Sequence, residues 1–292
     1  MSAPRMIAHL LLERLSQKIL PRIPEADPIM AASDQINAFM ESGRDEGFLT
    51  YLYFFHALMA LPVIRPGDTV LDLACGPANQ LALMARLNPQ THFIGIDASH
   101  NMLELARATL ASTATNNVSL QHGDMTQMQN IATASIDCVL CTMSLHHLPD
   151  AATLHAAMGE TRRVLKRDGG IYFADFGRLR RTATQNFFAF DRADAQSQQF
   201  TDDFLQSMRA AFSIGELESA TGQLGTTLTR HATALAPFLL IFRSNNRRLV
   251  DSVLAAQATR HYRRMTRRQQ RDFDNIARWF RLGGLPLPCR ID

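Results

Sequence analysis

Residues 70–78, Val-Leu-Asp-Leu-Ala-Cys-Gly-Pro-Ala, decide the fold of this chain. An apolar run that contains Asp72 ends in a turn of small residues, and a helical pattern follows the turn directly. A strand, a tight turn and a helix N-terminus in this order form a cradle for a nucleotide, because the bare backbone can approach a ligand there. The carboxylate of Asp72 disfavours a pyrophosphate ligand, which is anionic, and favours a ligand that carries positive charge.

Short apolar runs alternate with helical patterns between residues 68 and 176, which is typical of a parallel sheet covered by helices. The expected strands are residues 69–74, 92–97, 118–122, 137–143 and 171–176, followed by 226–233 and 237–242. Residues 177–212 interrupt the alternation and are expected to form a helical insertion. The sequence therefore predicts the α/β fold class.

The second and third expected strands also end in acids, which are Asp97 and Asp124. The carboxyl ends of parallel strands meet at one edge of a sheet, so these acids and Asp72 are expected to share one ligand site. A carboxylate in the position of Asp97 can accept both hydroxyls of a ribose. The carboxylate of Asp124 can accept a hydrogen bond from an exocyclic amine while Met125 packs on a purine.

Five stretches of the chain together resemble the class I S-adenosylmethionine-dependent methyltransferases, in the small-molecule group that includes the trans-aconitate and quinone-biosynthesis methyltransferases. They are Val70–Ala78, Gly95–Glu104, Gly123–Met125, Ser144–Asp150 and Arg163–Gly170. The resemblance implies an enzyme that uses S-adenosylmethionine and releases S-adenosylhomocysteine. It also implies a Rossmann-like, doubly wound sheet of seven strands whose last strand is antiparallel.

The same resemblance suggests a division of the chain. Residues 1–64 are expected to form an N-terminal helical cap, and residues 65–243 the cofactor-binding core. The insertion at 177–212 is expected to cover the acceptor site. Residues 244–292 are expected to form an arginine-rich helical extension.

Carried over position by position, the resemblance assigns eleven residues to the cofactor. They are Asp72, Ala74, Gly76, Ala78, Asp97, Ala98, Met102, Asp124, Met125, Cys141 and Thr142. The first four would hold the methionine part, the next five the ribose and adenine, and the last two would face the methionine end. Ala74 and Ala78 stand where the family has glycines, which tightens the cradle without blocking it.

His146 and His147 follow the fourth expected strand, beside the expected position of the methyl group. His146 is the candidate catalytic residue, as a general base that removes a proton from the nucleophile. The alternative is that the two histidines only pack and cap this loop. Asp175, at the end of the fifth strand, either faces the same pocket or forms a turn before Gly177.

Positive charge is concentrated near the C-terminus. The 292-residue chain has a formal net charge of +3, yet residues 243–292 hold 12 arginines, no lysine, 4 aspartates and no glutamate, a local +8 (12 − 4). Arginines from Arg260 to Arg271 recur at helical spacing and predict one basic face, which favours a solvated surface over one that binds RNA, an acidic substrate or a membrane. Arg178, Arg180 and Arg181 are candidates to hold an anionic group of the acceptor.

Four cysteines are too few and too scattered for a disulfide framework, and a reduced, cytoplasmic setting fits them best. Cys138 and Cys141 form a Cys-x-x-Cys pair inside an apolar run, which favours buried thiols over a zinc site. The sequence indicates no other metal-ligand cluster, no signal peptide and no apolar run long enough to span a bilayer. Near the N-terminus, one stripe of an expected helix over residues 5–20 carries Ile7, Leu11, Leu15 and Ile19.

The sequence thus predicts a methyl transfer by in-line displacement from S-adenosylmethionine to a small or medium organic acceptor. Three alternatives stay open. An RNA or protein methyltransferase would bind through the arginine face, and binding to nucleic acid is not favoured by the overall charge. An enzyme with other S-adenosylmethionine chemistry would differ in product mass, and a silent regulatory module would bind the cofactor without turnover. The oligomeric state and the acceptor are not indicated.

Overall fold

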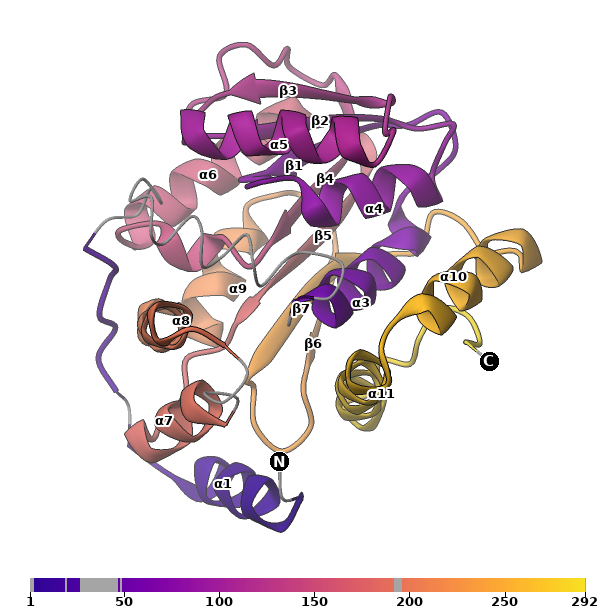
Figure 1. The fold of residues 1–292 in the computed structure, drawn as a ribbon. Helices are drawn as coiled ribbons and strands as arrows, with labels where there is room; N and C mark the ends of the chain where they lie inside the picture. Colours follow the sequence, from indigo (N-terminus) through magenta and orange to yellow (C-terminus); the bar gives the residue numbers. More distant parts are fainter. Residues whose placement is uncertain (1–2, 19, 27–46, 48, 192–195, 292) are drawn as a thin grey trace.

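The structure, a computed structural model, describes residues 3–18, 20–26, 47, 49–191 and 196–291. Seven strands form one sheet in the order β3-β2-β1-β4-β5-β7-β6 (Figure 1). They are β1 (Thr69–Leu73), β2 (His92–Asp97), β3 (Val118–His122), β4 (Ile136–Thr142), β5 (Leu165–Phe176), β6 (Leu228–Ala232) and β7 (Leu239–Ser244). The first five run parallel, and β7 is antiparallel to both β5 and β6. The predicted fold class, with an antiparallel last strand, is confirmed.

Helices cover both faces of this sheet and extend beyond it (Figure 1). They are α1 (Ala3–Leu15), α3 (Thr50–Ala60), α4 (Asn79–Leu87), α5 (His100–Ser112), α6 (Ala151–Val164), α7 (Thr182–Phe190), α8 (Gln198–Ala210), α9 (Ile214–Gly222), α10 (Ser252–Arg264) and α11 (Arg267–Leu282). Helices α7 and α8 fall within the segment that the sequence predicts to be a helical insertion.

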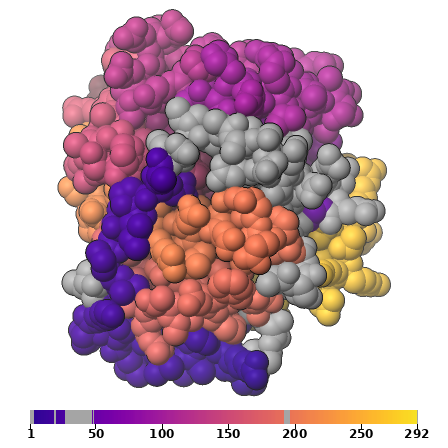
Figure 2. Space-filling model, turned by 60° about the vertical axis from the view of Figure 1, so that its left-hand side comes forward, coloured from indigo at the N-terminus to yellow at the C-terminus, as the bar shows by residue number. Residues whose placement is uncertain are grey.

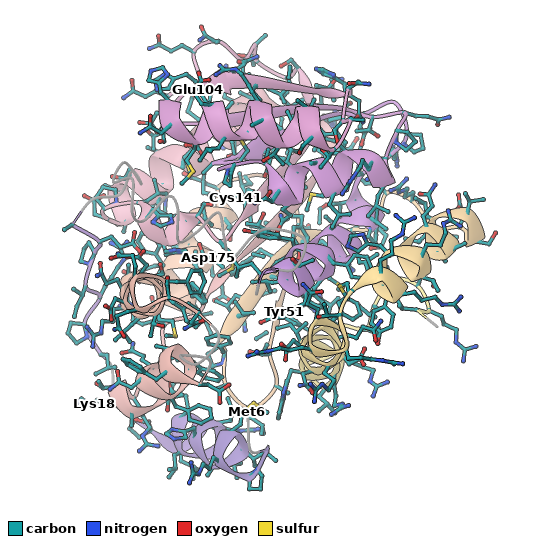
Figure 3. All side chains as sticks on the ribbon, viewed as in Figure 1. Met6, Lys18, Tyr51, Glu104, Cys141 and Asp175 are labelled. Atoms are coloured by element: carbon teal, nitrogen blue, oxygen red, sulfur yellow. The ribbon has the colours of Figure 1, made fainter. Side chains whose placement is uncertain are left out.

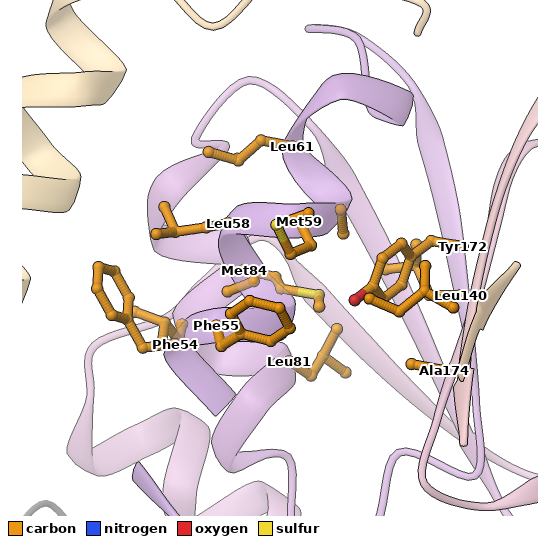
Figure 4. Packing of buried hydrophobic residues seen from close by; sticks show 14 of the residues in the cluster. Phe54, Phe55, Leu58, Met59, Leu61, Leu81, Met84, Leu140, Tyr172 and Ala174 are labelled. Carbon is orange, nitrogen blue, oxygen red and sulfur yellow. The ribbon is translucent and has the colours of Figure 1, made fainter. Parts of the chain in front are cut away.

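Each face of the sheet has its own apolar core, because successive residues of a strand point to opposite faces. Val70 and Tyr172 belong to the core under α3, α4 and α5, whereas Leu71 and Phe173 belong to the core under α6 and α9. Figure 4 shows the first core, where side chains of α3 and α4 lie close to Tyr172. The near-continuous apolar sequences of β1 and β4 suit strands that are covered on both faces.

Strand β5 begins earlier than the sequence predicts, at Leu165 instead of Ile171. Leu165 pairs with Ile136, and the register then shifts so that Gly170 pairs with Cys138. A polar stretch between these two pairings therefore belongs to the strand although it lacks an apolar pattern. Such an irregularity depends on the neighbouring strand, which a local pattern does not contain.

Helices α10 and α11 divide the arginine-rich region. Helix α10 ends at Arg264 and α11 begins at Arg267, so the predicted single basic face over Arg260–Arg271 is wrong. A capping box causes the break: the Thr266 hydroxyl accepts a hydrogen bond from the backbone of Gln269, and the Gln269 side chain accepts one from Thr266 N–H. The Thr-x-x-Gln pattern is the signal in the sequence that marks this break.

The N-terminal segment lies outside the sheet layers. Helix α1 packs beside α7, and the chain that follows it runs along α8, where Ile23 N–H donates to the Arg209 carbonyl at 3.0 Å (Figure 2). Within the ranges given above, the structure contains no helix that is both long and apolar enough to cross a membrane.

Candidate functional site

A cavity of about 560 Å³ lies at the carboxyl ends of β1, β2 and β4. The strand order reverses between β1 and β4, which is where open α/β sheets bind ligands. The volume lies in the range that is usual for small-molecule sites. From the strand ends the cavity extends past Tyr51 of α3 to Met6 of α1 (Figure 3).

The turn after β1 forms one wall of the cavity and is strained. Ala74, Gly76 and Ala78 have φ values of 55°, 53° and 60°. This left-handed conformation costs a residue with a side chain about 1–2 kcal/mol. The Asp97 carboxylate helps to hold the turn, because one of its oxygens accepts a hydrogen bond from Gly76 N–H at 2.8 Å. Its other oxygen accepts one from Ser99 N–H, at the start of α5, also at 2.8 Å. Strain that is held in this way is typical of ligand sites.

Asp72 lies at the end of β1 and lines the cavity although it is only 4% exposed. Burial, together with the nearby charge of Asp97, raises the pKa of Asp72 to about 8. Among the residues that the structure describes, no basic side chain forms an ion pair with Asp72. A buried carboxylate without a counter-ion fits a positively charged ligand, which is the expected character of S-adenosylmethionine.

Two further polar side chains of the cavity wall, Tyr53 and Asn79, also fit a polar ligand. The Tyr53 hydroxyl forms a side-chain hydrogen bond with Asn79, at the start of α4. The Asn79 amide nitrogen is buried and has no partner within the described residues. Both side chains line the cavity and offer it polar groups.

The nucleoside end predicted from the sequence gathers along the same cavity. Its wall includes Asp97, Ala98, Met102, Asp124 and Met125, which come from the ends of β2 and β3 and the start of α5. The pKa of Asp97 is raised because burial outweighs the two backbone hydrogen bonds that the carboxylate accepts. The structure thus brings these five residues together.

Two of the eleven predicted cofactor residues do not reach the cavity wall. Cys141 and Ala78 are fully buried in the two cores of the sheet. Thr142, the next residue after Cys141, does line the cavity, and the Gln80 amide donates a hydrogen bond to its hydroxyl. The alternation of side chains along β4 accounts for this difference between two neighbours.

His146 lies at the cavity, in a short 3₁₀ turn after β4, and is 2% exposed. Its Nδ1 is 2.6 Å from Asp175 Oδ1, and its backbone N–H donates to Asp175 Oδ2 at 3.0 Å. Burial lowers the pKa of His146, but the charge of Asp175 and this hydrogen bond raise it by more, so the net shift is upward. Asp175 therefore holds His146 at the cavity but does not itself line the cavity wall.

His147 pairs with a second carboxylate, that of Glu25, which comes from the N-terminal segment. Glu25 Oε2 is hydrogen bonded to His147 Nδ1, and Glu25 Oε1 accepts from the Ser207 hydroxyl at 2.8 Å. Burial raises the pKa of Glu25, but the bond to His147 and the positive charge near it lower it by more. Glu25, His146 and His147 each place one possible metal-ligating atom within 4.8 Å of the others. As they stand, His147 pairs with Glu25 and His146 pairs with Asp175.

Arg22 fixes the segment that carries Glu25. Its guanidinium donates to the carbonyl oxygens of His146, Leu148, Pro149 and Ala210. It also lies over the Phe212 ring, 3.9 Å from its centroid. Arg22 and Glu25 were not predicted from the sequence, because they lie more than 120 residues before His146 and His147 and in no recognisable motif.

The three arginines that the sequence offers for an anionic acceptor do not line the cavity. Arg178 forms an ion pair with Glu216 at 2.7 Å, and Arg180 donates to the Ser16 carbonyl at 2.9 Å. Both arginines therefore tie the loop between β5 and α7 to neighbouring segments, and the prediction that Arg178 and Arg180 hold an anionic group of the acceptor is wrong.

The rest of the cavity wall is largely aromatic and apolar, although it also includes the acids Asp191, Asp203 and Asp272. The rings of Phe188 and Phe238 stack with centroids 4.1 Å apart, and those of Phe176 and Phe204 lie 5.5 Å apart. All four line the cavity, as does Trp279 of α11. This half suits a ligand with a large apolar surface.

Residues 64–230 match the family model described as "Methyltransferase domain", which is more than half of the chain. The chain belongs to this family. The predicted resemblance and the predicted cofactor, S-adenosylmethionine, are confirmed by this membership.

Two curated relatives illustrate how far the likeness reaches. The demethylmenaquinone methyltransferase of Listeria monocytogenes is 32% identical over 118 residues, which is 40% of this chain and 48% of that protein. The "uncharacterized 37.1 kDa protein in transposon TN4556" of Streptomyces fradiae is 36% identical over 112 residues, which is 38% of this chain and 31% of that protein. The chain thus matches less than half of the length of these relatives.

Solved structures share the fold at low sequence identity. A SAM-dependent methyltransferase from Aquifex aeolicus superposes with a TM-score of 0.54 at 14% identity, over 75% of this chain and 98% of that one. A TehB-like SAM-dependent methyltransferase from Corynebacterium glutamicum gives a TM-score of 0.52 at 11% identity, over 74% of this chain and all of that one. At these identities the likeness concerns the fold alone.

Proposed function

We propose that the protein transfers a methyl group from S-adenosylmethionine to a hydroxyl group of a small or medium, largely apolar acceptor. One observation carries the proposal: the unpaired Asp72 carboxylate and the His146–Asp175 pair line or flank the same cavity. The first fits a cationic donor and the second fits the removal of a proton from an acceptor. The aromatic half of the cavity favours an apolar acceptor body.

The described residues mainly orient the reactants. When bound, S-adenosylmethionine supplies an electrophilic methyl group on a positively charged sulfur. Asp72 would balance that charge, and Asp97 and Asp124 would hold the ribose and the adenine. Orientation of this kind can supply about 7–11 kcal/mol of the barrier reduction, and the apolar walls exclude water.

His146 would remove the acceptor's proton. The Asp175 carboxylate accepts a hydrogen bond from Nδ1–H, so Nε2 is the free proton acceptor of the neutral ring. As the acceptor oxygen attacks, its proton would pass to His146 Nε2. The imidazolium that forms is stabilised by Asp175, which also fixes the orientation of the ring.

The experiment combines cofactor binding with turnover. We expect calorimetry to detect binding of S-adenosylmethionine, and mass spectrometry to detect methylated products from a panel of apolar phenols and alcohols. His146→Gln should lower kcat by about 10²–10⁴-fold and leave the cofactor Kd unchanged. His92→Gln, an exposed histidine on β2, is the matched control.

The pH profile tests the role of Asp175. A base must be neutral, so the rate should rise with pH through a pKa above 6.5, since Asp175 raises the pKa of His146. Asp175→Asn should move this step to lower pH. Full activity of His146→Gln at all pH values would remove it as the base, and cofactor binding without any methylated product would support a silent module instead.

A further inference from the structure

Two helices from opposite ends of the chain line the far end of the cavity. Helix α1 contributes Met6 and Leu10, and helix α11 contributes Ile276 and Trp279. The turn between β6 and β7 contacts α11, since the N–H of Ala234 donates to the Trp279 carbonyl at 3.1 Å, and Ala234 lines the same cavity. Figure 1 shows α1, this turn and α11 along the same end of the molecule.

The outer face of α1 is aliphatic and exposed. Ile7, Leu11 and Leu15 follow one another at every fourth position and are 41%, 45% and 74% exposed, and Leu12 beside them is 49% exposed. The inner face is formed instead by Leu10 and Glu13, which are buried. The aliphatic stripe that the sequence places on this helix therefore points away from the protein.

Arginines flank this stripe on both sides. Arg5 and Arg14 are exposed, and Lys18 follows the helix and is exposed as well. An exposed aliphatic face bordered by cationic side chains is the pattern of helices that lie in the interface of a bilayer.

The outer faces of α10 and α11 are cationic and also carry aliphatic residues. On α11, Arg267, Arg271 and Arg278 share one exposed face with Leu282, which is 63% exposed. On α10, Arg260 and Arg264 share a face with Val253, which is 64% exposed. The acids on these helices are fewer: Asp251 caps α10, Asp272 is buried, and Asp274 accepts a hydrogen bond from the Tyr262 hydroxyl.

We propose that the outer faces of α1, α10 and α11 dock on an anionic lipid bilayer, so that the cavity meets a lipid-soluble acceptor between α1 and α11. The choice of acceptor rests on the proposed function, whereas the docking does not. Each basic side chain near an anionic lipid surface favours binding. The exposed aliphatic side chains favour lipid over nucleic acid, because they can be buried in a bilayer but not against a phosphate backbone. A symmetric contact between two copies would set arginine against arginine.

Sedimentation of the full chain with vesicles tests this inference. We expect binding to vesicles of equal parts phosphatidylglycerol and phosphatidylcholine, little binding to phosphatidylcholine alone, and weaker binding as salt rises. Arg271→Ser with Arg278→Ser should weaken binding at least about tenfold. The charge-matched control is Arg107→Ser with Arg162→Ser, exposed arginines on α5 and α6.

The aliphatic stripe is tested separately. Leu11→Ser with Leu15→Ser should also weaken binding to the anionic vesicles, while thermal melts and the cofactor Kd stay as in the parent protein. Three outcomes would each overturn the proposal. They are equal vesicle binding by all variants, binding to single-stranded RNA but not to vesicles, and a dimer in solution that only the α1 variant dissociates. If the parent protein binds vesicles but methylates no acceptor, the proposed function is overturned and the docking proposal is not.

Discussion

Asp72 is the residue whose charge decides what the cavity binds. Its carboxylate has a pKa of about 8 because burial, and then Asp97, disfavour the charged form. A cationic ligand favours that charged form, so binding is coupled to loss of a proton. We predict that the Kd for S-adenosylmethionine falls as pH rises from 6 toward 8, by up to about tenfold per unit, and levels off above it.

Calorimetry at several pH values checks this prediction. Asp72→Asn should weaken binding and remove most of the dependence on pH, since the amide carries no charge at any of these values. Glu104→Gln changes an exposed acid on α5 and should leave both quantities unchanged. A Kd for the parent protein that does not vary between pH 6 and 8 would contradict the coupling.

Among single residues, the sequence predicted those that directly follow a predicted strand. Asp72, Asp97, Asp124 and His146 each follow a strand, and the sheet topology brings strand ends together. Glu25 was not predicted, because its contact with His147 depends on how the N-terminal segment crosses α8 and on no spacing within either segment.

Gly177 controls how strand β5 ends, two residues after Asp175. A Cβ at Gly177 would lie 2.0 Å from the Pro237 carbonyl oxygen, which belongs to backbone and cannot turn aside. We predict that Gly177→Ala destabilises the protein by about 1–3 kcal/mol and also lowers activity, because the shift of β5 moves Asp175. Urea unfolding and kcat at fixed pH measure the two effects.

Gly159 of α6 provides the matched control. A Cβ there meets no atom within 4 Å, so Gly159→Ala should stabilise the protein by about 0.5–1 kcal/mol through helix propensity. If Gly177→Ala were as well tolerated as Gly159→Ala, the close approach of the β5 end to Pro237 would not hold in solution.

At the scale of elements, periodicity predicted which segments are helices or strands better than it predicted which face of a helix is buried or where a helix ends. The stripe of Ile7, Leu11 and Leu15 has the spacing of a buried helix face, yet it is exposed, since the buried face carries Leu10 and Glu13 instead. Ile19, the fourth residue of the predicted stripe, lies outside the described residues. The spacing of the arginines likewise continued across the break at Thr266. Both cases depend on tertiary packing or on capping, which a hydrophobic period does not report.

Helix α3 contributes both to the wall of the cavity and to the apolar core. Its first turns bring Tyr51 and Tyr53 to the cavity, and its later turns bury Phe54 and Phe55 against α11 and the sheet. The C-terminal helices therefore support the same helix that closes the cofactor site. Strands β1–β5 and their acids were predictable as a unit, whereas this packing of distant helices was not, because it joins segments more than 200 residues apart.

His56 makes the stability of the whole fold depend on pH. Its ring is fully buried on α3, and its Nδ1 is 2.7 Å from the Tyr172 hydroxyl of β5. Burial lowers the pKa of His56 to about 3, although Asp175 raises it slightly. In the unfolded chain the pKa returns to about 6.5, so the unfolded state binds more protons between these values and stability falls as pH falls.

We predict that the free energy of unfolding drops by about 2–3 kcal/mol more in the parent protein than in His56→Gln between pH 6.5 and 4.5. Glutamine keeps a partner for Tyr172 but cannot take up a proton. His146 does not mask the effect: its folded pKa is raised, so its contribution is lost above pH 6.5 instead. Urea unfolding across this window measures the difference, with His92→Gln as an exposed control. Parallel losses in the parent and in His56→Gln would show that His56 takes up its proton without unfolding the molecule.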